Sequence, residues 1–322
     1  MVDQDVILQE YNTLLAITGG RVGAYQLVQN GLLARRTLGL TVKATHSDGT
    51  PVVIKLISRG GAVHSNWHAI DRMVRCQQAL THPHIVRLVE VFVTNNYLAI
   101  VSEFVGDGDS VSDYLSSPGV RTPAHCRAFF QQLILAIEYC HSRSWAIRHL
   151  KTDALLLDFG VDGSPVLKIS YFGYAKHDDS VARTIATPLP FIAPEVLGYE
   201  EYDKQAADMW SCGAILCDMF IGWIPNLTRV DWNINAVLPQ LEEIPQEARI
   251  ILGRLMIRDP AERDTASQVL QSPWIAQGLP AGAMQMNDIA RHNSPSQNDM
   301  VRFREELEAK LAEASVPAPA QG

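Results

Sequence analysis

The sequence lacks the features that mark several large protein classes. No apolar run approaches the roughly 20 residues that a membrane-spanning helix needs. Lysine and arginine form no block of any length, and the formal net charge at pH 7 is −8. Neither nucleic acid nor an acidic membrane is therefore expected as the main partner. The N-terminal segment carries acids before a short apolar run, which is unlike a secretory signal or an Arg-rich transit peptide.

Cysteine is scarce and is not arranged for metal binding. The five cysteines are odd in number, and none of them has the C-x-x-C spacing of a zinc or redox site. Reduced, buried thiols are expected, which favours a protein of the cytoplasm and/or nucleus. With 47% hydrophobic and 19% charged residues, the 322-residue chain is expected to be globular, as one large two-lobed domain or two domains.

The first third of the chain alternates strand signals with turn signals. Four runs rich in Val, Ile, Thr and aromatic residues predict strands over 41–45, 52–57, 86–93 and 97–104. An Asp-Gly pair between the first two predicts a hairpin, and helical spacing over 66–80 predicts a helix. We therefore expect an antiparallel sheet with one main helix.

From residue 122 onward the pattern is mainly helical. Apolar residues recur at intervals of three and four between Phe129 and Cys140, which predicts a long amphipathic helix. Two short strands are predicted next, and then three helices and a linker. The expected ranges are 154–157 and 166–169 for the strands, 206–221, 245–257 and 265–271 for the helices, and 276–297 for the linker.

Five short motifs follow one another between the predicted hairpin and the last of these helices. They are V-I-K ending at Lys55, H-P-H-I-V starting at His82, A-P-E ending at Glu195, D-M-W-S-C-G starting at Asp208, and Arg263 within DPAERD. Their types and order resemble those of eukaryotic protein kinases. LAIVSEF, FFQQLI, FGYAK and GLPAGAMQMND look most similar to plant stress-activated serine/threonine kinases of the sucrose-non-fermenting-related subclass two.

The resemblance covers residues 25–275 and implies an α+β, bilobal protein-kinase fold. A small β-rich N-lobe with one main helix is expected over 25–102, a hinge over 103–105 and a larger α-helical C-lobe over 106–275. An N-terminal extension (1–24) would precede them. In this family the residues matching Glu195, Asp208 and Arg263 hold the large lobe together, so they indicate the fold and say little about chemistry.

The reaction centre that the resemblance implies has lost its functional groups. Where the family has H-R-D-L-K-x-x-N, His149 replaces the catalytic aspartate and Ala154 the magnesium-binding asparagine. Asp158-Phe159-Gly160 spells D-F-G but follows His149 too closely for two strands to intervene, so we interpret it as part of the turn between those strands. The metal position is then Tyr171, and a neutral phenol is a poor magnesium ligand.

The expected phosphate loop is also depleted. At least two of the three glycines in the family's G-x-G-x-x-G-x-V are missing from NGLLARRTLGLT in either plausible register, although Gly31 and Gly39 remain. Side chains then stand where the backbone must approach phosphate. The residues concerned are Leu33, Ala34, Arg35 and Arg36.

Lys55 has no glutamate to pair with on the predicted helix. No glutamate occurs from Leu56 to Val89, and the family's helix glutamate is replaced by Met73, or by Ile70 if the register slips. Asp71 is the only acid available there, and its side chain is shorter.

Together these losses predict a pseudokinase. A general base alone contributes about 10²–10⁴-fold to rate, and no compensating group is visible. A scaffold or allosteric regulator of a partner kinase or complex is expected, with no or very weak phosphotransfer. The expected cofactor is none, or at most weak metal-independent ATP at a vestigial nucleotide site. By family resemblance that site comprises Lys55, Glu103, Val105 and Lys151.

Two alternatives remain open. The first is an unconventional ATP-dependent serine/threonine kinase in stress signalling, or a nucleotidyl transferase, that has recruited Lys55, Lys151, Asp153 and Asp158. The second is a ligand-sensing domain that uses the cleft expected between the lobes.

The segment between Tyr171 and Glu195 is where family members are switched on by phosphorylation. The family's phosphorylated serine aligns with Arg183, while Thr184 and Thr187 remain as candidate regulatory residues. One hypothesis is that Arg183 supplies a constant charge in place of switching; a solvated loop is the simpler interpretation.

An amphipathic helix is predicted over 298–314, before a disordered tail at 315–322. We expect this helix to pack on the same chain, with docking into a partner's groove as the alternative. Its apolar stripe consists of Met300, Phe303, Leu307, Leu311 and Ala314.

Overall fold

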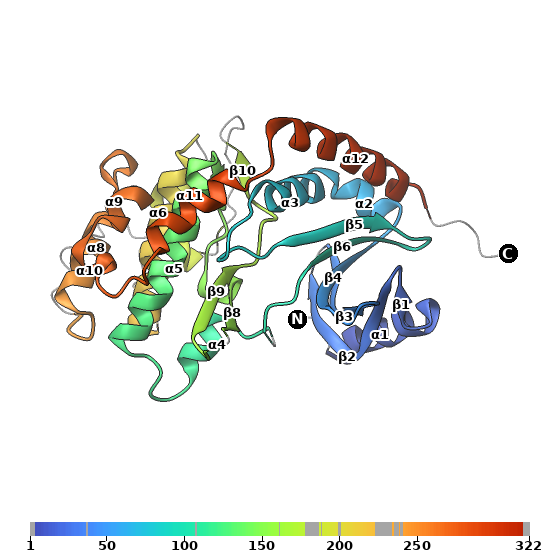
Figure 1. Cartoon of the computed structure of the whole chain (residues 1–322), viewed down its shortest axis with the longest axis horizontal. Helices are drawn as coiled ribbons and strands as arrows, with labels where there is room; N and C mark the ends of the chain where they lie inside the picture. The colour runs from blue at the N-terminus through green and yellow to red at the C-terminus, as the bar shows by residue number, and fades with distance from the viewer. Residues whose placement is uncertain are drawn as a thin grey trace. The chain divides into compact units, whose positions relative to one another are not determined.

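The computed structural model describes residues 4–36, 38–106, 108–160, 162–177, 187, 189–198, 201–222, 234, 238 and 241–317. The chain divides into two compact units (Figure 1). We call them the sheet unit (Met1–Ala79, Arg87–Phe104 and Pro295–Gly322) and the helical unit (Leu80–Val86 and Val105–Ser294). A β-rich part and a larger helical part confirm the α+β fold class of the sequence analysis.

The sheet unit is built on one six-stranded antiparallel sheet with the order β1-β2-β3-β4-β6-β5. Its strands are β1 (Arg21–Val22), β2 (Tyr25–Arg36), β3 (Gly39–His46), β4 (Pro51–Ser58), β5 (Leu88–Val93) and β6 (Tyr97–Glu103). Its helices are α1 (Gln4–Thr18), α2 (Gly61–Ser65), α3 (Trp67–Ala79) and α12 (Gln297–Ser315).

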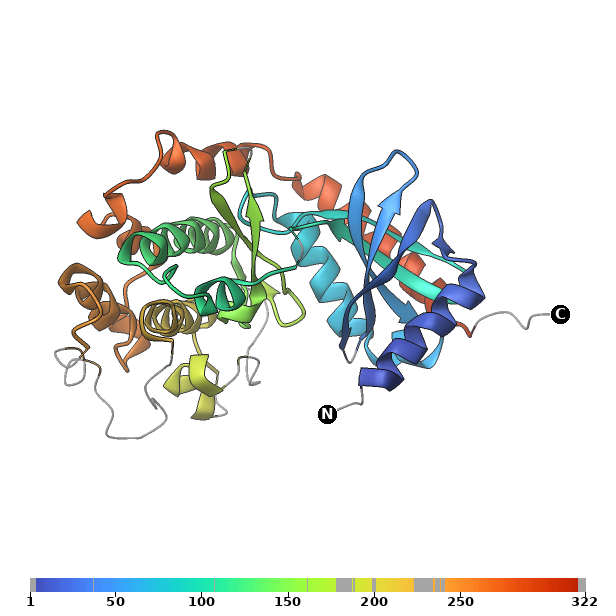
Figure 2. The same ribbon diagram turned by 90° about the horizontal axis from the view of Figure 1, so that it is seen from below.

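The helix α1 was not anticipated within the N-terminal extension. It lies alongside β1 and β2 (Figure 2) and buries Tyr11 and Leu14 against one face of the sheet. Ile54 of β4 belongs to the same core. Because side chains alternate across a strand, Lys55 points to the opposite face. The face that carries Lys55 is therefore not the one that α1 covers.

The tail helix α12 packs on its own chain, as expected from the sequence. Leu307, Leu311 and Ala314 are buried, and α12 contacts α2, α3 and β5. Arg59 holds the end of α12, because its guanidinium donates hydrogen bonds to the carbonyls of Glu313 (2.8 Å) and Val316 (3.3 Å). Residues 318–322 of the predicted disordered tail lie outside the described part of the chain.

Arg59→Ala is expected to loosen the tail and to lower the free energy of unfolding by about 1–3 kcal/mol, since charge-assisted hydrogen bonds are lost. The third bond of Arg59, to the carbonyl of Thr94 at 3.0 Å, is lost as well. Thermal denaturation measures the effect. Arg302→Ala is the control, because this α12 side chain is 83% exposed and pairs only along its own helix with Glu306 in the printed contacts. Equal melting temperatures for both variants would refute the role of Arg59.

The helical unit places helices around two short hairpins. The main helices are α5 (Pro123–Ser142), which Thr122 caps through the backbone N–H of His125, and α6 (Lys204–Ile221), which Asp203 caps. The shorter helices are α4 (Val111–Ser116), α8 (Gln246–Leu255), α9 (Ala266–Leu270), α10 (Pro273–Ala276) and α11 (Ala283–His292). The strands are β7 (Trp145–Ala146), β8 (Leu155–Phe159), β9 (Pro165–Ile169) and β10 (Lys176–His177), and the 3-10 turns are η1 (Thr152–Ala154), η2 (Leu189–Phe191), η3 (Pro194–Gly198) and η5 (Pro260–Glu262).

The segment 276–297, predicted as a linker, contains α11, so that prediction needs correction. A buried amide explains why the helix forms there: Asn287 donates to the carbonyl of Leu135 on α5 (3.0 Å), and its Oδ1 lies 2.9 Å from Nε2 of His82. Composition alone gave no sign of these partners, which are far away in the sequence.

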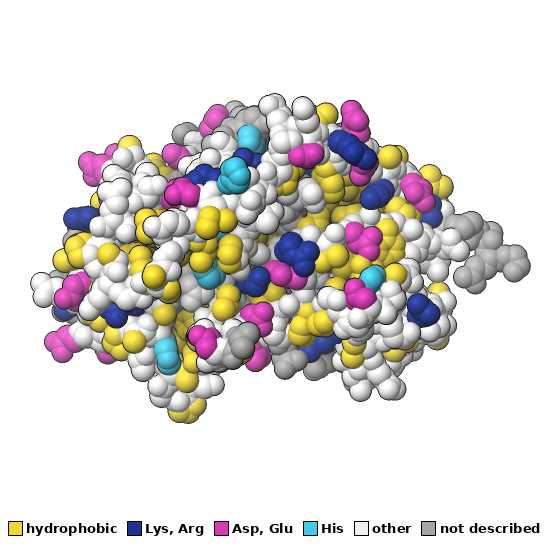
Figure 3. Space-filling view, viewed as in Figure 1, with side chains coloured by type: hydrophobic (Ala, Val, Ile, Leu, Met, Phe, Trp, Pro, Cys, Tyr) yellow, Lys and Arg dark blue, Asp and Glu magenta, His cyan; other side chains and the backbone are white. Residues whose placement is uncertain are grey.

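Charged side chains of both signs are interspersed on the face seen in Figure 3. Among the described residues, no helix is both long and apolar enough to cross a membrane.

Candidate reaction centre and nucleotide site

The D-F-G at Asp158 belongs to a strand hairpin and not to a metal site. Asp158 and Phe159 are the last residues of β8 and pair with Val166 and Pro165 of β9. They therefore extend the strand itself, and the turn begins only at Gly160. The phenyl ring of Phe159 is 52% exposed, whereas Phe172 in SYFGYAK is fully buried. The second F-G is thus the one that the core of the helical unit holds.

The loop that carries His149 keeps its backbone support. The Asp208 carboxylate on α6 accepts hydrogen bonds from the backbone N–H groups of Ile147 and Arg148, both at 2.7 Å, and lies 3.1 Å from Nε2 of His141. Arg148 has φ 62°, a left-handed conformation that is strained for a side chain of its size. Asp208 fixes this conformation, so the loop is shaped although its catalytic aspartate is absent.

Three aromatic rings occupy the centre of the expected chemistry. The ring centroids of His149 and Tyr171 are 4.7 Å apart, those of His149 and Tyr174 5.2 Å, and those of the two tyrosines 6.0 Å. We call these three residues the aromatic cluster. Tyr171 folds back over Gly173, where an added Cβ would lie 2.9 Å from the tyrosine hydroxyl.

The residues at this centre do not fit a kinase's magnesium ions. The two metal positions are Tyr171, whose ring packs within the aromatic cluster, and Ala154, which is buried and has no ligand atom. Within the described parts of the chain, no three His, Cys, Asp or Glu side chains are grouped so that they could hold a metal. We therefore derive no reaction step through magnesium.

The acids of the alternative hypothesis are engaged locally. Lys151 forms an ion pair with Asp153 at 2.9 Å, and the Asp153 side chain is 61% exposed. The Asp158 carboxylate accepts a hydrogen bond from the backbone N–H of Phe159 at 2.9 Å. Lys151 and Asp153 are adjacent and Asp158 stands at a strand end, so the printed contacts bring only two of these three together.

In the sheet unit, Lys55 faces a thioether where a kinase has a carboxylate. Its Nζ lies 3.6 Å from Sδ of Met73, which is buried on α3. The alternative register with Ile70 is therefore wrong. Asp71 pairs with Arg75 at 3.1 Å, one turn further along α3.

The hairpin between β2 and β3 replaces an open phosphate loop. The strands are paired up to Arg36 and Gly39, and Ala34 pairs with Thr41. Gly39 has φ 123°, and a Cβ there would lie 2.0 Å from the carbonyl oxygen of Leu56. At Gly31 a Cβ would lie 2.7 Å from the carbonyl oxygen of Val28. Both glycines are thus required by strand geometry, without any phosphate.

The chain near the expected hinge is ordered by contacts of its own. Glu103 closes a two-way link with Arg87: its N–H donates to the Arg87 carbonyl, and its carboxylate accepts from the Arg87 N–H, both at 3.0 Å. Phe104 lies under the ammonium of Lys43, 5.2 Å from the ring centroid, and Val105 is buried.

Of the candidate regulatory residues, Thr184 lies outside the described residues, as does Arg183. The hydroxyl of Thr187 donates to the carbonyl of Arg148 at 2.7 Å. The guanidinium of Arg148 is buried and donates to the hydroxyl of Tyr202 from Nε (3.0 Å) and Nη2 (2.6 Å). Thr187 and Arg148 therefore act together in holding the loop.

Arg263 and Glu195 form a buried ion pair in the helical unit. Two hydrogen bonds join them, at 2.8 and 3.2 Å. Arg263 also donates to the carbonyls of Ala206 (2.6 Å) and Ile257 (2.9 Å) and lies over the ring of Trp210, 5.2 Å from its centroid. These contacts tie the A-P-E segment to α6 and to the turn before η5.

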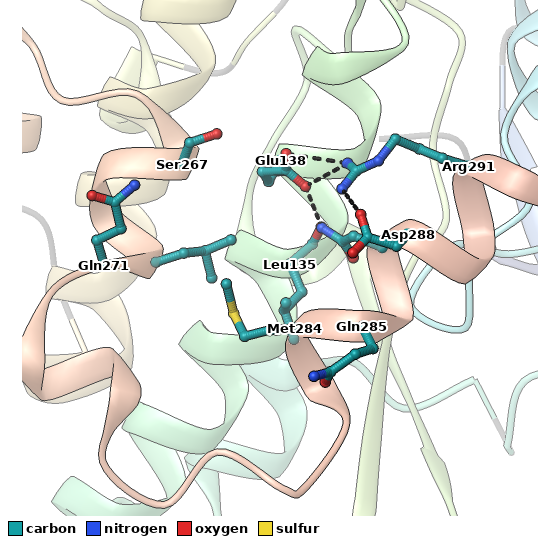
Figure 4. A pocket seen from close by; sticks show the side chains of 10 residues that line it. Leu135, Glu138, Ser267, Gln271, Met284, Gln285, Asp288 and Arg291 are labelled. Atoms are coloured by element: carbon teal, nitrogen blue, oxygen red, sulfur yellow. Dashed lines mark hydrogen bonds and ion pairs between the residues drawn. The ribbon is translucent and has the colours of Figure 1, made fainter.

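The sequence analysis missed two features of the helical unit. Tyr174 was not singled out, although its place three residues after Tyr171 was a usable signal. A cavity of about 250 Å³ between α5, α9 and α11 was also missed (Figure 4). At its rim Arg291 bridges Glu138 (3.1 Å) and Asp288 (2.7 Å).

Comparison with known proteins agrees with this geometry. The protein kinase domain model matches residues 31–275. The serine/threonine-protein kinase SAPK2 of Oryza sativa is 35% identical over 286 residues, covering 82% of this chain and 80% of the relative. SRK2H of Arabidopsis thaliana, also a serine/threonine-protein kinase, is 34% identical over 282 residues, covering 83% and 76%. SAPK9 of Oryza sativa is 32% identical over 322 residues, covering 96% and 83%.

Proposed function

The chain belongs to the protein kinase family, and within that family we propose that it is a pseudokinase, a scaffold or allosteric regulator of a partner kinase or complex. The aromatic cluster carries this proposal. The positions of the catalytic base and of one metal ligand are held by His149 and Tyr171, whose rings pack on each other.

Phosphoryl transfer depends almost entirely on positioning and on neutralising charge. A residue at the base position must accept a proton from the attacking hydroxyl, and the metal must bridge phosphate oxygens. His149 packs against two tyrosines, and Ala154 offers no oxygen. The loss of these groups supports a role through binding, while Asp208, Arg263 and Glu195 maintain the fold.

An unconventional serine/threonine kinase is the second candidate, because the relatives above carry that name. Lys55 and Lys151 are retained, and Asp153 lies beside Lys151. In this version Asp153 would have to supply both a base and a metal ligand. Its ion pair with Lys151 and its high exposure favour the first candidate.

Calorimetric titration with ATP tests the proposal. Weak binding, or none, is expected, and magnesium should leave it unchanged, because Ala154 and Tyr171 supply no ligand for a metal–nucleotide complex. Lys55→Met should abolish whatever binding is seen, since this ammonium would face phosphate. Micromolar binding that disappears on chelation would contradict the proposal, and Asp153 and Asp158 would then be the first residues to mutate.

All five cysteines are buried thiols in the structure. This supports the cytoplasmic and/or nuclear location that we propose for the protein.

A further inference from the structure

A surface pocket of about 610 Å³ lies in the sheet unit, where α2 meets α3. Trp67 lines it, together with His64, His68 and Arg72. Ser315, the last residue of α12, completes the wall. None of the lining side chains is acidic. We call it the α2–α3 pocket.

The surrounding segment has a charge opposite to that of the chain as a whole. From Leu56 to Val89 the sequence has four arginines and one aspartate, a net charge of +3, within a chain of −8. The single acid, Asp71, is paired with Arg75 at 3.1 Å. The pocket therefore presents two imidazoles and a guanidinium around an indole ring, with no carboxylate in its wall.

The docked tail helps to build the pocket. The backbone N–H of Gly60, at the start of α2, donates to the carbonyl of Ala314 at 2.8 Å, and Arg59 binds the carbonyls of Glu313 and Val316. These bonds bring Ser315 to the pocket wall. A tail that leaves α2 would open one side of the pocket.

We propose that the α2–α3 pocket binds an acidic segment of a partner protein. An apolar side chain of that segment packs on Trp67, and its carboxylates lie against His68 and Arg72. Charge complementarity selects this occupant, because cations lining a site on an anionic protein attract negative partners and repel positive ones. Trp and Arg are also the side chains that most often dominate binding energy. This inference rests on the proposed function, for which it names the partner surface.

The test uses the full chain and a fluorescein-labelled peptide of aspartates and glutamates with two central leucines. Fluorescence anisotropy should show binding that weakens as salt is raised. Trp67→Ala and Arg72→Glu should each weaken binding by about tenfold or more, as expected for residues at the centre of an interface. Arg59→Ala should also weaken it, because the tail wall is lost. A peptide with lysines in place of the acids should not bind.

Arg302→Glu is the matched control, since it brings the same charge change to an α12 side chain that is 83% exposed and does not line the pocket. It should leave the affinity unchanged, and circular dichroism shows whether each variant is folded. No binding by the wild type, or equal affinity in Trp67→Ala, would overturn the proposal. Self-association that Trp67→Ala abolishes would assign the pocket to a second copy of the chain.

These outcomes are separable from those of the proposed function. Phosphate transfer by the wild type, with the peptide still bound at the pocket, would remove the pseudokinase role and keep the pocket. Absence of both transfer and peptide binding would remove only the pocket.

Discussion

Arg263→Ala is expected to lower the free energy of unfolding by about 3–5 kcal/mol, the usual cost of leaving one partner of a buried ion pair uncompensated. The Arg263 side chain is fully buried, and the Glu195 carboxylate that would remain is only 14% exposed. The substitution also removes hydrogen bonds to the carbonyls of Ala206 and Ile257 and the cation–π contact with Trp210. Chemical denaturation followed by circular dichroism measures the change.

Arg254→Ala is the control for this experiment. Arg254 lies in the same unit and pairs with Asp264 at 3.7 Å, but its side chain is 58% exposed. Exposed pairs contribute about 0–1 kcal/mol, so little change is expected. If both variants lost the same stability, the Arg263–Glu195 pair would not be the element that holds the A-P-E segment.

Restoring the metal ligands is expected to produce magnesium-dependent ATP binding. The double variant Tyr171→Asp, Ala154→Asn places a carboxylate and an amide oxygen at the two metal positions, and magnesium takes oxygen ligands of this kind. We expect ATP affinity in magnesium to rise by about tenfold or more over the wild type, since a metal bridging the phosphates offsets several kcal/mol of charge. Calorimetry with and without magnesium gives the comparison.

Tyr171→Phe with Ala154→Asn is the matched control. It keeps an aromatic ring against His149 and Tyr174 but supplies no carboxylate. Its ATP binding should stay independent of magnesium. If the aspartate variant folds and still shows no magnesium dependence, the loss of ligands at Tyr171 and Ala154 would not explain the state of the site.

The sequence predicted the replaced residues of the site because their positions depend on local spacing. The short distance from His149 to Asp158 left no room for two strands, and the hairpin of β8 and β9 agrees with that reasoning. Met73 was identified opposite Lys55 because no glutamate is available on the helix, and the two side chains lie 3.6 Å apart.

Contacts between distant segments could not be predicted in this way. The apolar face of α1 was visible as a short run, but its burial depends on Tyr11 and Leu14 finding a sheet face formed much later in the chain. The helix α11 depends on Asn287 reaching His82 and α5.

The aromatic cluster also needed the fold. The sequence showed that Tyr171 is no metal ligand, but not that its ring would pack on His149 and Tyr174. Likewise, Gly39 could be counted as a remnant of the phosphate loop until its approach to Leu56 was known.

The transfer of radiolabelled phosphate from ATP, in magnesium, to the protein itself and to generic substrates tests the pseudokinase claim most directly. Signals from the wild type and from Lys55→Met should both equal the background without protein, because His149, Ala154 and Tyr171 replace the base and the metal ligands. Phosphate transfer by the wild type that Lys55→Met abolishes would contradict the account and show an active kinase.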